Sequence, residues 1–173
     1  MRRTTLMLAT MAIALVLGSG VALAATVNCT GTLCYGTGKA DIISGTNARN
    51  VIEGFGGDDR IYGYGGDDEM YGQVNADLLL GGKGNDEVYG GSGNDRLFGE
   101  GGSDSISGGN GADVLVGGPG IDEIYGNRDN DTINSKDGIA EIVDCGLGTD
   151  KATVDMDSQG RLIDNVSNCE TIN

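Results

Sequence analysis

Aliphatic residues recur at every ninth position between Gly36 and Asn134, and this spacing is the main pattern in the chain. Reading each unit from a glycine gives eleven consecutive nonapeptides. Position 8 of the unit is always aliphatic: Ile43, Ile52, Ile61, Met70, Leu79, Val88, Leu97, Ile106, Leu115, Ile124 and Ile133. A disordered Gly-rich acidic linker has no reason to keep such a phase, so the repeat predicts a folded array.

The residue types within the unit predict its local structure. Positions 1 to 6 are rich in Gly and Asn, which adopt left-handed backbone angles readily, and they predict a tight turn. Positions 7 to 9 alternate outward, inward and outward, as in a minimal strand. Two units then complete one coil, with position 8 from both facing inward. The chain is therefore expected to be all-β, a parallel β-roll (β-solenoid) about 26 Å long at the usual strand spacing.

Position 6 of the unit carries the candidate chemistry. One aliphatic side chain per nine residues contributes about 1.5–3 kcal/mol, less than the backbone entropy lost at roughly 1–2 kcal/mol per residue. Stacked coils also bring like charges together every 18 residues. Ca²⁺ removes this repulsion, since it accepts six to eight oxygen ligands at flexible angles, whereas Mg²⁺ demands octahedral geometry. The candidate ligands are Asp41, Asn50, Asp59, Asp68, Asp77, Asp86, Asp95, Asp104, Asp113, Asp122 and Asp131.

Composition excludes several other function classes. The chain has no His, so Ser-His-Asp triads and His-ligated zinc are ruled out. Its net charge of −15 argues against nucleic-acid partners and anionic membranes. Residues 1–24 have the order of a signal peptide: Arg2 and Arg3, an apolar run, then the small-residue site Ala22-Leu23-Ala24. We therefore expect a secreted, extracellular protein with no membrane span after cleavage and a net charge of −17.

The units resemble the RTX, or haemolysin-type, calcium-binding repeat, whose motif is Gly-Gly-x-Gly-x-Asp-x-aliphatic-x. The clearest matches are the units 81–89 and 90–98. The resemblance implies a β-roll domain at 36–134 in which up to about nine Ca²⁺ lie between turns two units apart. Asn50 lacks a charge, and Ala48, Asn75 and Asp129 replace the position-4 glycine, so sites at the Asn50, Asp77 and Asp131 turns should be weaker or empty. The catalytic domains of larger family members are not expected here, and the protein should not be an enzyme.

The flanking segments predict caps. Residues 25–35 form the expected N-terminal cap and residues 135–173 the C-terminal cap. In the second, Glu141 takes the aspartate slot after a ten-residue unit, and residues 145–150 repeat the turn. Four cysteines allow three pairings. Because a disulfide cannot span the ends of the rod, the pairs are expected to be Cys29–Cys34 and Cys145–Cys169, the second stapling the C-terminal cap.

The outer face of the odd-numbered units carries a large apolar column: Tyr62, Leu80, Phe98 and Val116. One interpretation is a ladder that stiffens the sheet through neighbouring side chains. The other is a surface for self-association or for a cell-surface partner. Two functions therefore follow: an exported β-roll that folds on binding calcium, and, as the alternative, a calcium-dependent adhesin or cell-surface or matrix scaffold that uses this face.

Overall fold

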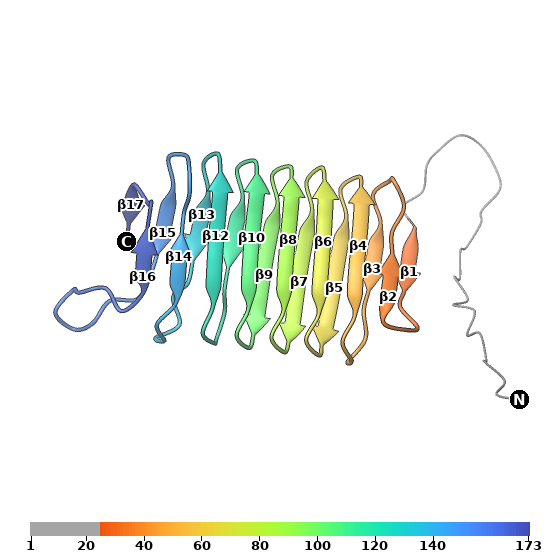
Figure 1. Ribbon diagram of the computed structural model, residues 1–173, viewed down its shortest axis with the longest axis horizontal. Coiled ribbons are helices and arrows are strands. Elements are labelled where there is room, and N and C mark those ends of the chain that lie inside the picture. Colours follow the sequence, from red (N-terminus) through yellow and green to blue (C-terminus); the bar gives the residue numbers. More distant parts are fainter. Residues whose placement is uncertain (1–24) are drawn as a thin grey trace, which may run out of the picture.

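The computed structural model describes residues 25–173, so the expected signal peptide, residues 1–24, lies outside the described residues. The described chain winds into a rod of stacked coils with parallel strands (Figure 1). Residues 25–173 contain no helix that is long and apolar enough to cross a membrane. The expectation of an all-β parallel β-solenoid is confirmed.

Two parallel sheets run along the rod. The nine-stranded sheet has the order β1 (Thr26–Asn28), β3 (Ile42–Ser44), β5 (Arg60–Gly65), β7 (Leu78–Lys83), β9 (Arg96–Gly101), β11 (Val114–Val116), β13 (Thr132–Asn134), β15 (Lys151–Thr153) and β17 (Thr171–Ile172). The eight-stranded sheet has the order β2 (Leu33–Tyr35), β4 (Val51–Gly56), β6 (Glu69–Val74), β8 (Glu87–Ser92), β10 (Ser105–Asn110), β12 (Glu123–Arg128), β14 (Ile142–Asp144) and β16 (Asn165–Ser167).

The core is a single file of aliphatic side chains between the sheets. Every position-8 residue of the eleven units is at most 1 % exposed. Strands pair 18 residues apart, so that Val88 lies beside Met70 and Ile106. The period therefore fixes the register as well as the core, because a slip of one residue would turn every aliphatic side chain outward.

Many strands are longer than the three residues that the pattern predicts. Eight of them have six residues, covering positions 7 to 9 and then positions 1 to 3 of the next unit. The pairing skips position 1, as at Gly90 between β8 and its neighbours. The glycine-rich half of the unit is therefore mostly strand, and only positions 4 to 6 make the turn.

Left-handed residues at positions 2 and 4 make this path sterically possible. Gly91 has a φ of +108°, and a Cβ on it would lie 2.3 Å from the carbonyl oxygen of Gln73. Gly93 has a φ of +145°, and its Cβ would lie 2.0 Å from the carbonyl oxygen of Asn75. Glycine at these two positions thus allows both the left-handed angle and the close approach to the neighbouring coil. Other residues keep a positive φ at position 2 in some units: Phe55, Tyr64, Gln73, Glu100 and Asn127.

The two flanking segments extend the solenoid. β1 pairs with β3, and β2 pairs with β4, so residues 25–35 add a coil at one end. Strands β14 to β17 continue both sheets at the other end. The predicted disulfides are present, with Cα–Cα distances of 5.5 Å for Cys29–Cys34 and 5.1 Å for Cys145–Cys169. The second closes a long loop, which contributes about 3 kcal/mol in the chain-entropy account.

Candidate metal centres

The position-6 side chains form two columns, one along each row of turns at opposite edges of the sheets. In each column, the position-6 backbone N–H donates to Oδ1 of the residue in the next coil. Ten such bonds have lengths of 2.7–2.9 Å and run from Asp41 to Asp150 in one column and from Asn50 to Asp122 in the other. The stacking of residues 18 apart, which the sequence predicts, is therefore built into the backbone.

The second carboxylate oxygen has no partner in most of these residues. The side chains are at most 3 % exposed, yet Oδ2 accepts no hydrogen bond in ten of them: Asp59, Asp68, Asp77, Asp86, Asp95, Asp104, Asp113, Asp122, Asp131 and Asp150. Burying a carboxylate oxygen without a partner is costly. These ten residues, called the orphan carboxylates below, thus lack a counter-charge or a proton.

A main-chain carbonyl lies beside the orphan oxygen in eight of these ten residues, as the turn around Asp95 shows. A Cβ on Gly90 would be 2.5 Å from Oδ2 of Asp95 and 2.7 Å from the carbonyl oxygen of Gly108 in the next coil. Position 1 therefore faces a cradle of oxygens that only glycine leaves open. Carboxylate and carbonyl oxygens are the ligands that Ca²⁺ takes in proteins, so the residues present fit this ion.

Burial also perturbs the acidity of the orphan carboxylates. Removal from water raises the pKa of Asp59, Asp95 and Asp131 to about 6, and that of Asp68, Asp77, Asp104 and Asp113 to about 7. The N–H bond from the preceding coil opposes the increase, while neighbouring carboxylates add to it in most of these residues. Near neutral pH, ionisation of the columns therefore opposes folding unless a cation compensates.

The first two predicted ligands differ from the rest. Oδ2 of Asp41 accepts bonds from the N–H and the hydroxyl of Thr37. Asn50 likewise accepts from the N–H and hydroxyl of Thr46, while its Nδ2 donates to the carbonyl of Gly31 at 3.0 Å. Both side chains thus have hydrogen-bond partners within the protein, and neither has an unpartnered buried oxygen like Oδ2 of the orphan carboxylates.

Sequence reasoning left Asp150 out of the ligand set. Its turn begins with Cys145 in place of glycine, but the column continues through it, since its Oδ1 accepts from the N–H of Asp131 at 2.8 Å. The signal was present in the repeated turn Cys145-Gly146-Leu147-Gly148-Thr149-Asp150. Among the position-4 substitutions, Asn75 and Asp129 keep the left-handed angle, with φ of 82° and 73°.

Comparisons with known proteins agree with this geometry. The profile of a family described as "RTX calcium-binding nonapeptide repeat (4 copies)" matches residues 35–70, 71–106 and 107–139. A search among curated proteins gives no match. Because the family matches cover more than half of the chain and the columns supply oxygen ligands for calcium, the protein belongs to the RTX calcium-binding nonapeptide repeat family.

Proposed function

We propose that the protein is an exported, non-enzymatic calcium-binding β-roll that folds when it meets Ca²⁺ outside the cell. The observation that carries this proposal is the set of ten orphan carboxylates, each buried and each lacking a partner for Oδ2. Ca²⁺ bound between coils supplies positive charge where the thin core cannot offset like-charge repulsion. Binding to the folded form alone then stabilises it by mass action.

Export is supported by two independent features. The leader pattern of residues 1–24 is typical of secreted proteins. All four cysteines pair in the fold, and disulfides persist mainly in oxidising compartments. Mass spectrometry of the protein recovered from the culture medium tests this part. We expect a chain that begins at Ala25 and has both disulfides, and a chain found only inside cells with residues 1–24 attached would contradict export.

A structural role, without catalysis, is supported by where the acidic groups lie. The orphan carboxylates are sealed inside the walls of the roll, where a substrate does not reach them. The chain also has no His to act as a general base near neutral pH. Calcium is then a structural ion that joins neighbouring coils.

Circular dichroism tests folding on calcium directly. In chelator at neutral pH we expect the spectrum of a disordered chain, and after Ca²⁺ addition the spectrum of a β-rich protein. An equal concentration of Mg²⁺ should not restore the β signal, because the cradles offer flexible carbonyl and carboxylate oxygens without octahedral order. Identical spectra in chelator and in calcium would contradict this proposal.

The alternative role of an adhesin or scaffold has one observation in its favour. Tyr62, Leu80, Phe98 and Val116 lie in register on β5, β7, β9 and β11 and stay half-buried on the outer face. Replacing Tyr62 and Phe98 together by Glu tests whether this column binds a partner. Loss of self-association in sedimentation, or of retention at the cell surface, would favour the alternative, and no change in either would reject it.

A further inference from the structure

The regular column of carboxylates is interrupted near the C-terminal end of the roll. The unit 135–144 has one extra residue, and Glu141 occupies the slot that holds Asp in the repeats. In the described part of the chain, Glu141 accepts no bond from the preceding coil, and neither of its carboxylate oxygens has a hydrogen-bond partner. The side chain is nevertheless only 2 % exposed. Glu141 therefore has two buried oxygens without a partner, whereas each repeat aspartate has at most one.

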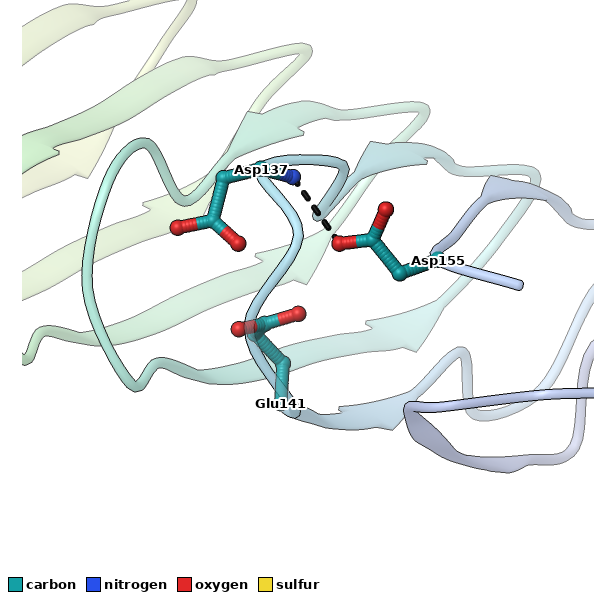
Figure 2. A group of neighbouring side chains, drawn as sticks. All are labelled: Asp137, Glu141 and Asp155. Atoms are coloured by element: carbon teal, nitrogen blue, oxygen red, sulfur yellow. Dashed lines mark hydrogen bonds between the residues drawn. The ribbon is translucent and has the colours of Figure 1, made fainter. Parts of the chain in front are cut away.

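Two further carboxylates converge on Glu141. Asp137 lies in the turn before β14, and Asp155 follows β15 in the next coil. One carboxylate oxygen from each of the three residues lies within 4.8 Å of the other two. Figure 2 shows the three side chains directed toward a common space, with Glu141 reaching it from the opposite side.

The two aspartates are held in place by backbone donors. Oδ2 of Asp155 accepts from the N–H of Asp137 at 3.0 Å and from that of Gly138 at 2.5 Å. The oxygens of Asp137 accept from the N–H of Gly120 at 2.9 Å and of Ile139 at 2.8 Å. These bonds orient the carboxylates before any ligand arrives, which reduces the ordering that binding requires.

A fourth acidic residue braces this group from behind. Asp164 accepts from the hydroxyl of Ser135 at 2.7 Å and from the N–H of Asp155 at 2.9 Å through Oδ2, and from the N–H of Glu141 at 3.3 Å through Oδ1. Both of its oxygens are therefore already engaged. Asp164 positions the other residues and adds negative charge to their surroundings.

The group has no basic counter-charge in the described chain. The ion pairs among residues 25–173 are Arg49–Glu69 and Arg161–Asp157, and neither involves these residues. Burial, together with Asp164, Asp137 and Asp155, raises the pKa of Glu141 to about 9. A proton on Glu141 would neutralise one charge and leave both aspartates uncompensated, whereas a divalent cation would neutralise two and bind all three.

We propose that Asp137, Glu141 and Asp155 bind one hard divalent cation, Ca²⁺ in the secreted protein, at a site separate from the repeats. The donors are carboxylate oxygens, which hard cations prefer, and no thiolate or imidazole takes part. In the repeats each turn offers one orphan carboxylate beside a glycine cradle. Here Ser135 replaces that glycine, and three carboxylates from two segments share one ion. The ion fastens the irregular C-terminal coils, including β14, to the regular roll.

Counting bound calcium by equilibrium dialysis of the full chain tests this site. Glu141→Gln keeps the shape of a protonated glutamate but removes the charge, and we expect it to bind one Ca²⁺ fewer than the wild-type protein. Asp155→Asn keeps an oxygen for the N–H groups of Asp137 and Gly138 and should lose the same ion, which covers the case in which Glu141→Gln does not fold. Glu123→Gln on exposed β12 is the matched control and should leave the count unchanged.

Hydrogen exchange in calcium provides the second measurement. In Glu141→Gln the amides of β14 and β16 should exchange at least tenfold faster, while those of β7 to β9 keep their wild-type rates. An unchanged calcium count together with unchanged exchange would overturn the proposal and would identify Glu141 as a neutral buried acid. Asp95→Asn tests the repeat sites separately. If Asp95→Asn loses an ion and Glu141→Gln loses none, the C-terminal site alone is rejected.

Discussion

The first coil of the repeat region and the coils that follow use the same position of the unit in different ways. At Asp41 and Asn50, the N–H and hydroxyl of Thr37 and Thr46 satisfy the position-6 oxygen. From Asp59 onward, the equivalent oxygen has no partner. Where a Thr at position 2 donates to the position-6 oxygen, that oxygen does not need an ion. Where position 2 is not Thr, the position-6 carboxylate oxygen is left for a cation to bind.

Asn50 makes this contrast clearest. Its Nδ2 donates to the carbonyl of Gly31 in the preceding coil at 3.0 Å, so an amide joins two coils where an orphan carboxylate would face the carbonyl with like partial charge. Asn50 departs from the calcium-binding motif, but its amide therefore makes the contact between coils that calcium would otherwise make.

The largest effect is expected from pH when calcium is absent. The pKa of the orphan carboxylates is raised by burial to about 6 for Asp59 and about 7 for Asp68, above the ordinary value of 3.8. The folded form therefore holds protons more tightly than the unfolded chain, and its stability in chelator should be fullest in acid and fall as pH rises through 6 to 7. Thermal unfolding in chelator checks this, and greater stability at pH 8 than at pH 5 would contradict it.

Asp95→Asn separates charge from hydrogen bonding in the central coils. The amide oxygen still accepts from the N–H of Asp77, so the backbone ladder survives while the negative charge is lost. We expect one Ca²⁺ fewer per chain and a loss of stability in calcium of about 2.7 kcal/mol, the value for a site filled at a hundred times its Kd. Calorimetric titration measures the ion count, and chemical denaturation in calcium measures the loss of stability.

Asp41→Asn is the matched control for that experiment. Both oxygens of Asp41 already accept bonds from within the chain, at Ala25 and Thr37. The calcium count should therefore stay at the wild-type value. If Asp41→Asn and Asp95→Asn lost the same number of ions, the distinction between the two regions would be wrong.

Much of the fold follows from the sequence, and the part that does not has a physical reason. The phase of position 8 is sufficient to predict the two sheets and the inward column from Ile43 to Ile133, because position 8 is aliphatic in all eleven units whereas positions 7 and 9 vary. The six-residue strands were missed because Gly91 and its equivalents suggest a turn, whereas their left-handed angle lets the strand continue past position 1.

The candidate sites divide in the same way. Periodicity identifies Asp59 and its equivalents, but it cannot separate them from Asp41, since the difference lies in the hydroxyl of Thr37 at a variable position. Asp137 and Asp155 could not be paired with Glu141 from sequence. An extra residue in the unit 135–144 interrupts the nine-residue spacing. Asp155 lies in the loop between β15 and β16, and the position of that loop depends on tertiary contacts.

Asn50→Asp should turn a self-sufficient turn into one that requires calcium. The new carboxylate would face the carbonyl of Gly31 without the amide donor, so at limiting calcium, where the roll is folded but the new site is empty, the protein should lose about 1–3 kcal/mol, as for a buried group left unpaired. Calcium should restore most of this loss and raise the count by one ion. Chemical denaturation at limiting and at saturating calcium measures the effect, and equal losses in both conditions would count against the comparison.

Thr46→Val is expected to have the smallest effect. It removes the hydroxyl that donates to Asn50 at 3.1 Å but keeps the backbone donor and the shape. A loss of about 0.5–1.5 kcal/mol is typical of one hydrogen bond, and it should be the same at limiting and at saturating calcium. A loss that appears only in calcium would mean that this turn binds an ion after all.

Anomalous diffraction from crystals grown in calcium tests the central claim most directly, because it locates the ions without reference to the chain. The account predicts peaks between coils beside Oδ2 of the orphan carboxylates, from Asp59 to Asp131 and at Asp150, with none beside Asp41 or Asn50. Gaps without metal next to Asp86, Asp95 and Asp104, in crystals saturated with calcium, would contradict it.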